Sequence, residues 1–211
     1  MKTFDILQIK LLLRLYNYLY KRISSLSVKI NNGVHPKHKI MDYHSYFLNN
    51  IKNDSKVLDI GCGIGALAYD IANKAGYVVG IDINEELIRI AKTKFPKKNI
   101  EYITGDATNY NFKEKYDYLV LSNVLEHIKN RHEFLEKIRN LADIFLIRVP
   151  MINRSWIVLY EKELNIDYRS DNSHYIEYTF DSFEKEINQA GLKITSHIIR
   201  FGEIWAEIER A

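Results

Sequence analysis

The stretch that decides the fold is Val57-Leu58-Asp59-Ile60-Gly61-Cys62-Gly63-Ile64-Gly65. Its first half is an apolar run typical of a buried strand, and its second half is a glycine turn leading into an apolar helical pattern up to about residue 75. Glycines let the backbone come close to a ligand, and the amides at a helix start favour a carboxylate or a phosphate. The stretch therefore predicts a ligand site at a strand end without identifying the ligand.

Strand-like and helix-like patterns alternate along the rest of the chain, as they do in a parallel α/β sheet. Strands are predicted over residues 56–60, 77–81, 100–104, 116–121 and 144–149, followed by two β-like runs at 192–200 and 203–209. Only Phe201 and Gly202 separate these last two runs, so we expect them to be antiparallel to each other. Helix starts are indicated by Asn84, by Asn130 with Glu133, and by Asp181 with Glu184.

Length and composition fit one ordinary globular domain, since the 211 residues are 46% hydrophobic and 27% charged. The single cysteine, Cys62, excludes an intrachain disulfide and a multi-cysteine zinc site, and it fits a cytoplasmic protein. The seven histidines show no helical zinc-binding pair. We therefore predict no metal.

Positive charge gathers in the first 40 residues, where eight Lys or Arg accompany one acidic residue, Asp5. The remaining residues hold 22 basic and 26 acidic side chains and carry a net charge of −4. A mildly acidic body predicts no general nucleic-acid-binding surface. No nucleic-acid partner is expected.

Residues 1–34 are predicted to form an amphipathic helical arm ahead of a domain at residues 35–211. At about 100° per residue, Lys10, Arg14, Asn17 and Lys21 share one narrow stripe, while leucines and tyrosines cover much of the remainder. The apolar run is too short to span a bilayer, and a signal-peptide cleavage pattern is absent. Three roles stay open for it: packing on its own domain, self-association, and peripheral contact with a membrane that carries anionic headgroups.

The glycine stretch alone does not separate two cofactor classes. Gly61, Gly63 and Ala66 also satisfy the relaxed dinucleotide fingerprint, so a nicotinamide-dependent oxidoreductase competes. Asp82 ends the second strand, where a carboxylate can accept hydrogen bonds from ribose hydroxyls in either class. Together with Asp59 and Asp106 it places carboxylates near the ends of three successive strands, the edge at which doubly wound sheets bind ligands.

Four ordered motifs favour one family: Asp59–Gly65, Gly80–Asp82, Thr104–Ala107 and Tyr116–His127. Their order and spacing resemble class I, Rossmann-like S-adenosylmethionine-dependent methyltransferases, most closely the broad type 11/12 group of small-molecule and glycan enzymes. The resemblance covers about residues 35–200. It implies a doubly wound, mostly parallel sheet of seven strands with an antiparallel last strand and helices on both faces. It also implies S-adenosyl-L-methionine as the cofactor.

Carried over residue by residue, the resemblance implies a set of cofactor-binding residues. Gly61, Cys62 and Gly63 would line the methionine portion and Asp59 would help to hold its amino group; Asp82 would bind the ribose hydroxyls beside Ile83 at the adenine; Asp106 and the Ala107 backbone would face the adenine amino group; Ser122 and Asn123 would lie below the sulfonium. For each carboxylate the alternative role is a cap or loop hydrogen bond. We assign Cys62 to packing, not to nucleophilic catalysis.

The acceptor side is predicted from three residues. The resemblance places His127 close to the transferred methyl group, where an imidazole can remove an acceptor proton. His174, in an aromatic-rich insertion at residues 151–178, and Tyr43 are further catalytic candidates, and for each a structural role is the alternative. The insertion itself is either a substrate lid or a helical decoration.

The activity expected is in-line methyl transfer to a small molecule or glycan, at oxygen. The alternatives are a non-catalytic binding module that keeps the fold and, less favoured, the nicotinamide enzyme. Asp59 and Asp82, whose loss would have favoured the binding module, are both present. The sequence does not identify the methyl acceptor.

Overall fold

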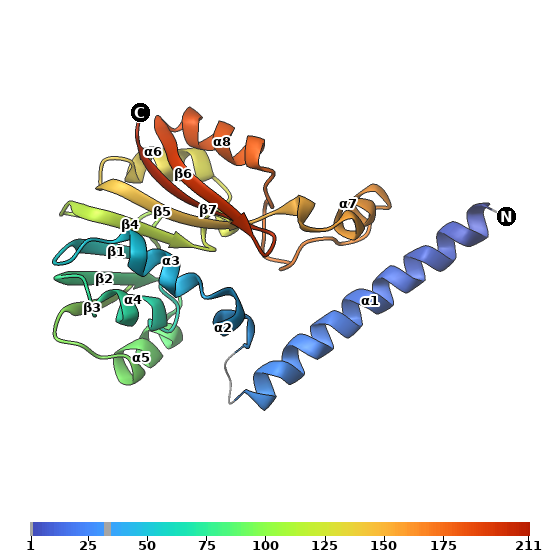
Figure 1. The fold of residues 1–211 in the computed structure, drawn as a ribbon, viewed down its shortest axis with the longest axis horizontal. Helices are drawn as coiled ribbons and strands as arrows, with labels where there is room; N and C mark the ends of the chain where they lie inside the picture. Colours follow the sequence, from blue (N-terminus) through green and yellow to red (C-terminus); the bar gives the residue numbers. More distant parts are fainter. Residues whose placement is uncertain (1, 32–34) are drawn as a thin grey trace.

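A seven-stranded sheet forms the centre of the molecule in the computed structural model, which describes residues 2–31 and 35–211 (Figure 1). The strands are β1 (Lys56–Ile60), β2 (Tyr77–Asp82), β3 (Ile100–Thr104), β4 (Tyr116–Ser122), β5 (Ala142–Pro150), β6 (Leu192–Arg200) and β7 (Glu203–Arg210). Their order is β3-β2-β1-β4-β5-β7-β6, with β1 to β5 parallel and β7 antiparallel to both of its neighbours. The predicted doubly wound sheet with an antiparallel last strand is confirmed.

Helices cover both faces of this sheet. On one face lie α3 (Tyr43–Asn50), α4 (Ala66–Ile71) and α5 (Glu85–Lys94), and on the other lie α6 (Arg131–Ile138) and α8 (Phe180–Gln189). Successive strand residues point to opposite faces, so Val57 packs with the first group and Leu58 with the second. A strand buried on both faces reads as a continuous apolar run, which is why these strands stand out in the sequence.

Two of the three predicted helix starts agree with the structure, at Asn84 before α5 and at Asn130 before α6. The Asn84 side chain caps α5 by accepting hydrogen bonds from the backbone amides of Glu86 and Leu87. The start predicted at Asp181 is wrong, and at Asn130 the start is right but the side-chain cap is wrong. In the described part of the chain Asn130 caps no backbone amide, because its side chain reaches Glu133 instead, and α8 is capped by Thr179 together with Ser182.

The insertion contains the 3₁₀ turn η2 (Ile152–Arg154) and the helix α7 (Trp156–Glu163), followed by an irregular return to α8. Figure 1 shows that α7 projects from the body on the side of the N-terminal helix α1 (Lys2–Ile30). Asn17 of α1 donates a hydrogen bond of 2.7 Å to Glu161 of α7. The short helix α2 (Lys37–Met41) precedes α3.

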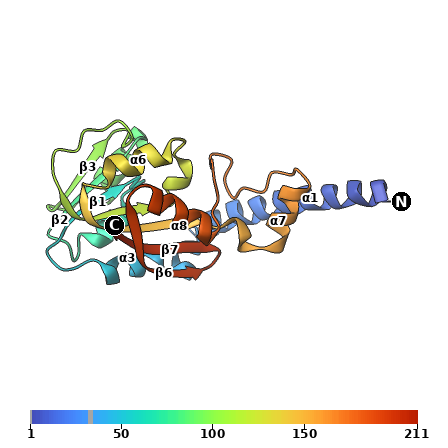
Figure 2. The ribbon, with the colours of Figure 1, turned by 90° about the horizontal axis from the view of Figure 1, so that it is seen from above.

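Helix α1 extends away from the sheet (Figures 1 and 2). Leu13 is buried, but Leu11, Leu12 and Leu15 are about half or more exposed. Across the described residues, no helix combines the length and the apolar character needed to cross a bilayer.

Candidate active site

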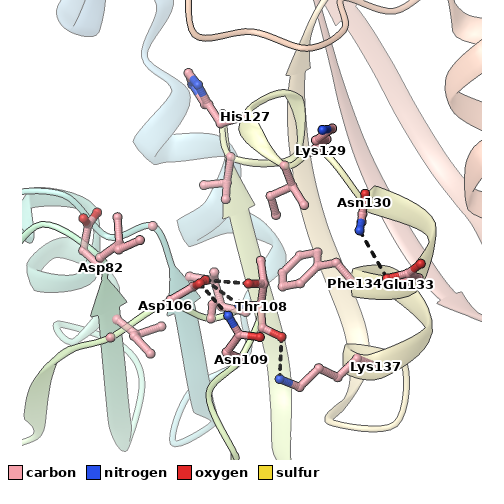
Figure 3. A pocket seen from close by; sticks show the side chains of 18 of the residues that line it. Asp82, Asp106, Thr108, Asn109, His127, Lys129, Asn130, Glu133, Phe134 and Lys137 are labelled. Atoms are coloured by element: carbon pink, nitrogen blue, oxygen red, sulfur yellow. Dashed lines mark hydrogen bonds between the residues drawn. The ribbon is translucent and has the colours of Figure 1, made fainter.

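A cavity of about 610 Å³ lies at the carboxyl ends of β1, β2, β3 and β4 (Figure 3). The chain passes from the edge strand β3 back to β4 beside β1, so this is the point at which the strand order reverses and where open α/β sheets bind ligands. Five of the predicted cofactor residues line the cavity: Gly61, Asp82, Ile83, Asp106 and Ala107. The others, Asp59, Cys62, Gly63, Ser122 and Asn123, are close neighbours of lining residues in the chain.

The glycine loop is shaped by positive backbone angles and close contacts. Gly61 has a φ of 71°, and a Cβ atom at this position would collide with the Val124 side chain. The Gly61 and Cys62 amides both donate to the Ile81 carbonyl oxygen, at 2.7 and 3.1 Å, which ties the loop to β2. These two amides are therefore already paired, and the glycines serve to let the backbone pass close to the cavity.

Asp82 holds the same loop from the end of β2. One carboxylate oxygen accepts from the Gly63 amide at 2.9 Å, and the other accepts from the Asn84 amide at 2.8 Å. The loop hydrogen bonds considered as the alternative role are thus present. A carboxylate offers about four acceptor positions, so two remain for ribose hydroxyls in the cavity.

Asp106 makes a local turn at the cavity rim (Figure 3). Its carboxylate accepts from the Thr108 amide at 2.9 Å, the Thr108 hydroxyl at 2.7 Å and the Asn109 side-chain amide at 2.9 Å. The Thr108 hydrogen bond is the main cause of a lowered pKa at Asp106. Asp106 therefore faces the cavity as a stable anion.

Asp59 and Cys62 are buried close to the loop. Asp59 is 1% exposed, and among the residues that the structure describes its Oδ2 atom has no hydrogen-bond partner. Burial, together with the nearby charge of Asp82, raises the pKa of Asp59 to about 8. Burial likewise raises the pKa of the Cys62 thiol, whose sulfur lies against Gly80, in keeping with a packing role.

Ser122 and Asn123 end β4 next to Arg148 of β5. The Ser122 hydroxyl accepts from the Arg148 guanidinium at 3.2 Å, and the Asn123 amide donates to the Arg148 carbonyl at 2.9 Å. Arg148 is itself buried and paired with Glu203 at 2.6 Å. The turn after β4 is thus held by a buried ion pair.

His127 and His174 lie together although 46 residues separate them in the chain. Their ring centroids are 4.6 Å apart in an edge-to-face arrangement, and His127 lines the cavity (Figure 3). Burial lowers the pKa of His127, and the neighbouring His174 adds to this effect. A neutral imidazole is the form that can accept a proton or a metal ion.

Tyr43 is placed differently from the two histidines. It is the first residue of α3 and packs on the face of the sheet that α3, α4 and α5 cover. The Arg148 guanidinium lies 3.8 Å from the centre of its ring. Its hydroxyl is 2.9 Å from Nδ1 of His38, and burial raises its pKa.

Several site residues were missed by the sequence reasoning. The cavity wall includes Lys129, Glu133 and Lys137 from α6 and the turn before it. Tyr175 of the insertion, which the sequence reasoning named with His174 as able to approach the cleft, also lines the cavity. The fold brings them there through long-range contacts, such as the hydrogen bond of 2.8 Å from the Tyr175 amide to the Glu126 carbonyl.

Glu126 was also missed as a site residue. It is fully buried, and burial raises its pKa to about 8.

A doubly wound sheet of this order, with a glycine turn after β1 and carboxylates at the ends of β1, β2 and β3, is the fold of class I, Rossmann-like S-adenosylmethionine-dependent methyltransferases. The profile of a family described as a methyltransferase domain matches residues 57–143, which run from β1 to the start of β5. The matched segment is 87 of the 211 residues.

Relatives agree with this assignment. The chain is 33% identical to N-methyltransferase 4 of Papaver somniferum over 116 residues, which are 50% of this chain and 33% of that protein. It is 28% identical to a ubiquinone biosynthesis O-methyltransferase of Glaesserella parasuis over 132 residues, 57% of this chain and 56% of that protein. It therefore matches about a third to just over half of the length of these two proteins.

A solved structure shares the fold. The magnesium protoporphyrin IX methyltransferase from Synechocystis PCC 6803 with bound SAH superposes with a TM-score of 0.64 at 18% identity, covering 83% of each chain.

Proposed function

We propose that this chain is an S-adenosylmethionine-dependent methyltransferase that acts at an oxygen atom of a small molecule or glycan. The observation that carries the proposal is the cavity at the switch point, walled by the glycine loop and by the carboxylates of Asp82 and Asp106. These groups fit a ligand with a ribose and an amino-substituted base. The buried and unpartnered Asp59 fits a ligand that also carries an ammonium group.

When bound, S-adenosylmethionine supplies a methyl group activated by a positively charged sulfur. Alignment of the acceptor would then account for most of the rate, with acid–base help where the acceptor loses a proton. Asp82 would hold the ribose, and Asp106 would orient the base. His127, which lines the same cavity, is the group that would face the acceptor.

The acceptor class rests on the resemblance to small-molecule and glycan enzymes. The relatives' names include both N- and O-methyltransferases, so they support methyl transfer without choosing the acceptor atom. The insertion, which brings Tyr175 to the cavity and His174 against His127, is the part of the chain that would shape the acceptor side.

The proposal is tested by isothermal titration of the full chain with S-adenosylmethionine, its demethylated product and NAD. We expect the first two to bind with micromolar affinity. Asp82→Ala should weaken this binding by about 1–3 kcal/mol, because the ribose hydroxyls and two loop amides lose a charged acceptor. Asp181→Ala, an exposed carboxylate on α8, is the matched control and should bind as the wild type does. Binding of NAD in place of S-adenosylmethionine would show a nicotinamide enzyme instead.

A binding module that keeps the fold would behave differently in a second assay. Incubation with methyl-labelled cofactor and fractionated cell extract should transfer label to one fraction. Tight cofactor binding with no labelled fraction would favour the non-catalytic alternative.

A further inference from the structure

Three side chains beside the cofactor cavity form a cluster that the cofactor does not explain. They are Glu126 and His127, from the 3₁₀ turn η1 (Leu125–His127) that follows β4, and His174 from the insertion. One nitrogen or oxygen atom from each residue lies within 4.8 Å of those of the other two. Glu126 and His174 are buried, whereas His127 is exposed and lines the cavity.

Glu126 is the unusual member of this cluster. Its side chain is fully buried, and neither carboxylate oxygen has a hydrogen-bond partner in the part of the chain that the structure describes. A buried polar group without a partner is costly, and native proteins rarely leave one so. Its Oε1 atom lies 4.0 Å from Nε2 of His174, which is too long for a hydrogen bond. Protonation of Glu126 would therefore not create a hydrogen bond to His174 at this distance.

A second carboxylate orients the His174 ring through its Nδ1 atom. Its Nδ1 atom lies 3.2 Å from Oε1 of Glu177, which is buried and ion-paired with Arg154. Glu177 accepts a hydrogen bond, so the Nδ1 atom carries the ring proton and the Nε2 atom presents its lone pair toward Glu126. A histidine held in this way by a carboxylate is the usual arrangement around a protein-bound metal ion.

A hydrogen bond to Nδ1 also orients the His127 ring. The Ser173 hydroxyl donates its proton to Asp171 at 2.6 Å, so its oxygen accepts from Nδ1 of His127 at 3.0 Å. The proton of His127 is therefore on Nδ1, and its Nε2 atom also presents a lone pair. The hydrogen bonds thus leave one lone pair available on each of the two imidazoles that lie beside the Glu126 carboxylate.

We propose that Glu126, His127 and His174 form a binding site for a divalent cation of the Zn²⁺ class. Two imidazole nitrogens and one carboxylate oxygen are the protein ligands of one common type of catalytic zinc site, which keeps its fourth position open. Zinc bonds of about 2.0–2.1 Å place tetrahedral ligands roughly 3.4 Å apart, so the three groups must close by about an ångström. His127, the exposed member, would move toward the other two, and Glu126 and His174 would shorten their separation of 4.0 Å.

The open position would face the cavity, because His127 is the ligand that lines it. A hydroxyl oxygen of the acceptor bound there would lose its proton more easily, as water does on a bound metal ion. This chemical role rests on the proposed methyl transfer, whereas binding of the cation does not. The prediction of no metal looked at cysteine sets and helical histidine pairs, whereas this cluster joins the adjacent Glu126 and His127 to His174, which lies 47 positions after His127.

The test is titration of the metal-depleted full chain with Zn²⁺, followed by calorimetry and by the visible spectrum with Co²⁺. We expect one ion per chain and the intense absorption of four-coordinate Co²⁺. Glu126→Gln and His127→Ala should each weaken binding at least tenfold, and Glu177→Gln should weaken it about 10- to 100-fold through the orientation of His174. His127 is exposed, so its variant should fold even if a buried substitution does not.

The matched controls are His132→Ala and Glu136→Gln, an exposed histidine–carboxylate pair on α6 whose Nε2 and Oε1 atoms are 3.8 Å apart. These variants should bind Zn²⁺ as the wild type does. Failure to bind one ion, or equal weakening by the α6 variants, would overturn the site. Titration with the demethylated cofactor in the same samples separates the two proposals: cation binding without cofactor binding would leave this site standing and remove the proposed function.

Discussion

Asp59 is a buried carboxylate that should lower the stability of the ligand-free protein. Its folded-state pKa, about 8, lies above the ordinary value of 3.8, so the folded protein holds a proton that the unfolded chain releases. Stability is therefore lost as the pH rises from about 4 through about 8. We predict that Asp59→Asn raises the free energy of unfolding of the ligand-free protein at pH 8 and changes it little near pH 4, as measured by urea denaturation.

Asp106→Asn is the control with the opposite sign. Hydrogen bonds lower the pKa of Asp106, so its charge stabilises the folded protein above the ordinary pKa and this contribution is lost in acid. The variant should be less stable than the wild type at pH 8. If Asp59→Asn also lost stability at pH 8, the assignment of Asp59 as a strained buried carboxylate would be wrong.

His127 is the residue whose replacement should affect turnover most selectively. Once the methyl acceptor is identified, we predict that His127→Ala lowers turnover on the order of 10²–10⁴-fold while cofactor affinity stays nearly unchanged. The reason is that the imidazole faces the acceptor, whether it takes the proton itself or holds a cation that does. Steady-state kinetics and titration measure the two quantities, and His132→Ala on α6 is the control. Turnover within a few-fold of the wild type would remove His127 from the reaction.

At the scale of elements, α5 and α6 allow a comparison of two asparagine caps. The Asn84 side chain accepts from two backbone amides of α5, whereas Asn130 reaches only the Glu133 side chain. We predict that Asn84→Ala lowers the free energy of unfolding by about 0.5–2 kcal/mol and that Asn130→Ala lowers it less. Urea denaturation of both variants decides this. Equal losses would show that the cap hydrogen bonds of α5 are not what the substitution removes.

The strands could be predicted from the sequence more accurately than the helix ends. The central strands are buried on both faces, so each is a short apolar run, as at Val57 and Leu58, that needs no knowledge of its neighbours. A cap depends instead on the backbone angles at one residue. Thr179 and Asp181 both have capping side chains, and only the folded chain shows that Thr179 is in the extended conformation that α8 requires.

The site residues likewise differ in how well the sequence predicts them. Gly61, Asp82 and Asp106 could be predicted because each follows a strand at a fixed spacing. The place of the insertion could not, because Tyr175 reaches the cavity, and His174 the neighbourhood of Glu126, through contacts within the insertion and with Glu126. Such contacts join distant parts of the chain and leave no local pattern.

At the scale of the whole molecule, α1 is the element whose role the domain itself does not explain. Its leucines and tyrosines are largely exposed beside a basic stripe, and the contact with α7 covers only part of it. We propose that α1 lies on membrane surfaces with anionic headgroups, since apolar burial and charge attraction both favour this. The intact chain should float with anionic vesicles at low salt and less so at high salt.

Charge reversal tests this attraction. Replacing Lys10, Arg14 and Lys21 by glutamate should leave the protein in the non-floating fraction. The control is the same change at Lys92, Lys94 and Lys98, which lie on α5 and just after it. Equal recovery of the wild type and the α1 variant in the non-floating fraction would remove the membrane role, and sedimentation would then measure self-association.

The burial of Cys62 has a consequence for how the loop can be watched. It is the one cysteine of the chain, it is only 8% exposed, and its amide is tied to β2. A thiol reagent can reach it only in the moments when the glycine loop lifts from the sheet, so the labelling rate counts those openings. A ligand seated over the loop holds it shut, and the same reaction then slows in proportion to occupancy. The labelling rate of Cys62 thus reports how often the binding site of this chain opens.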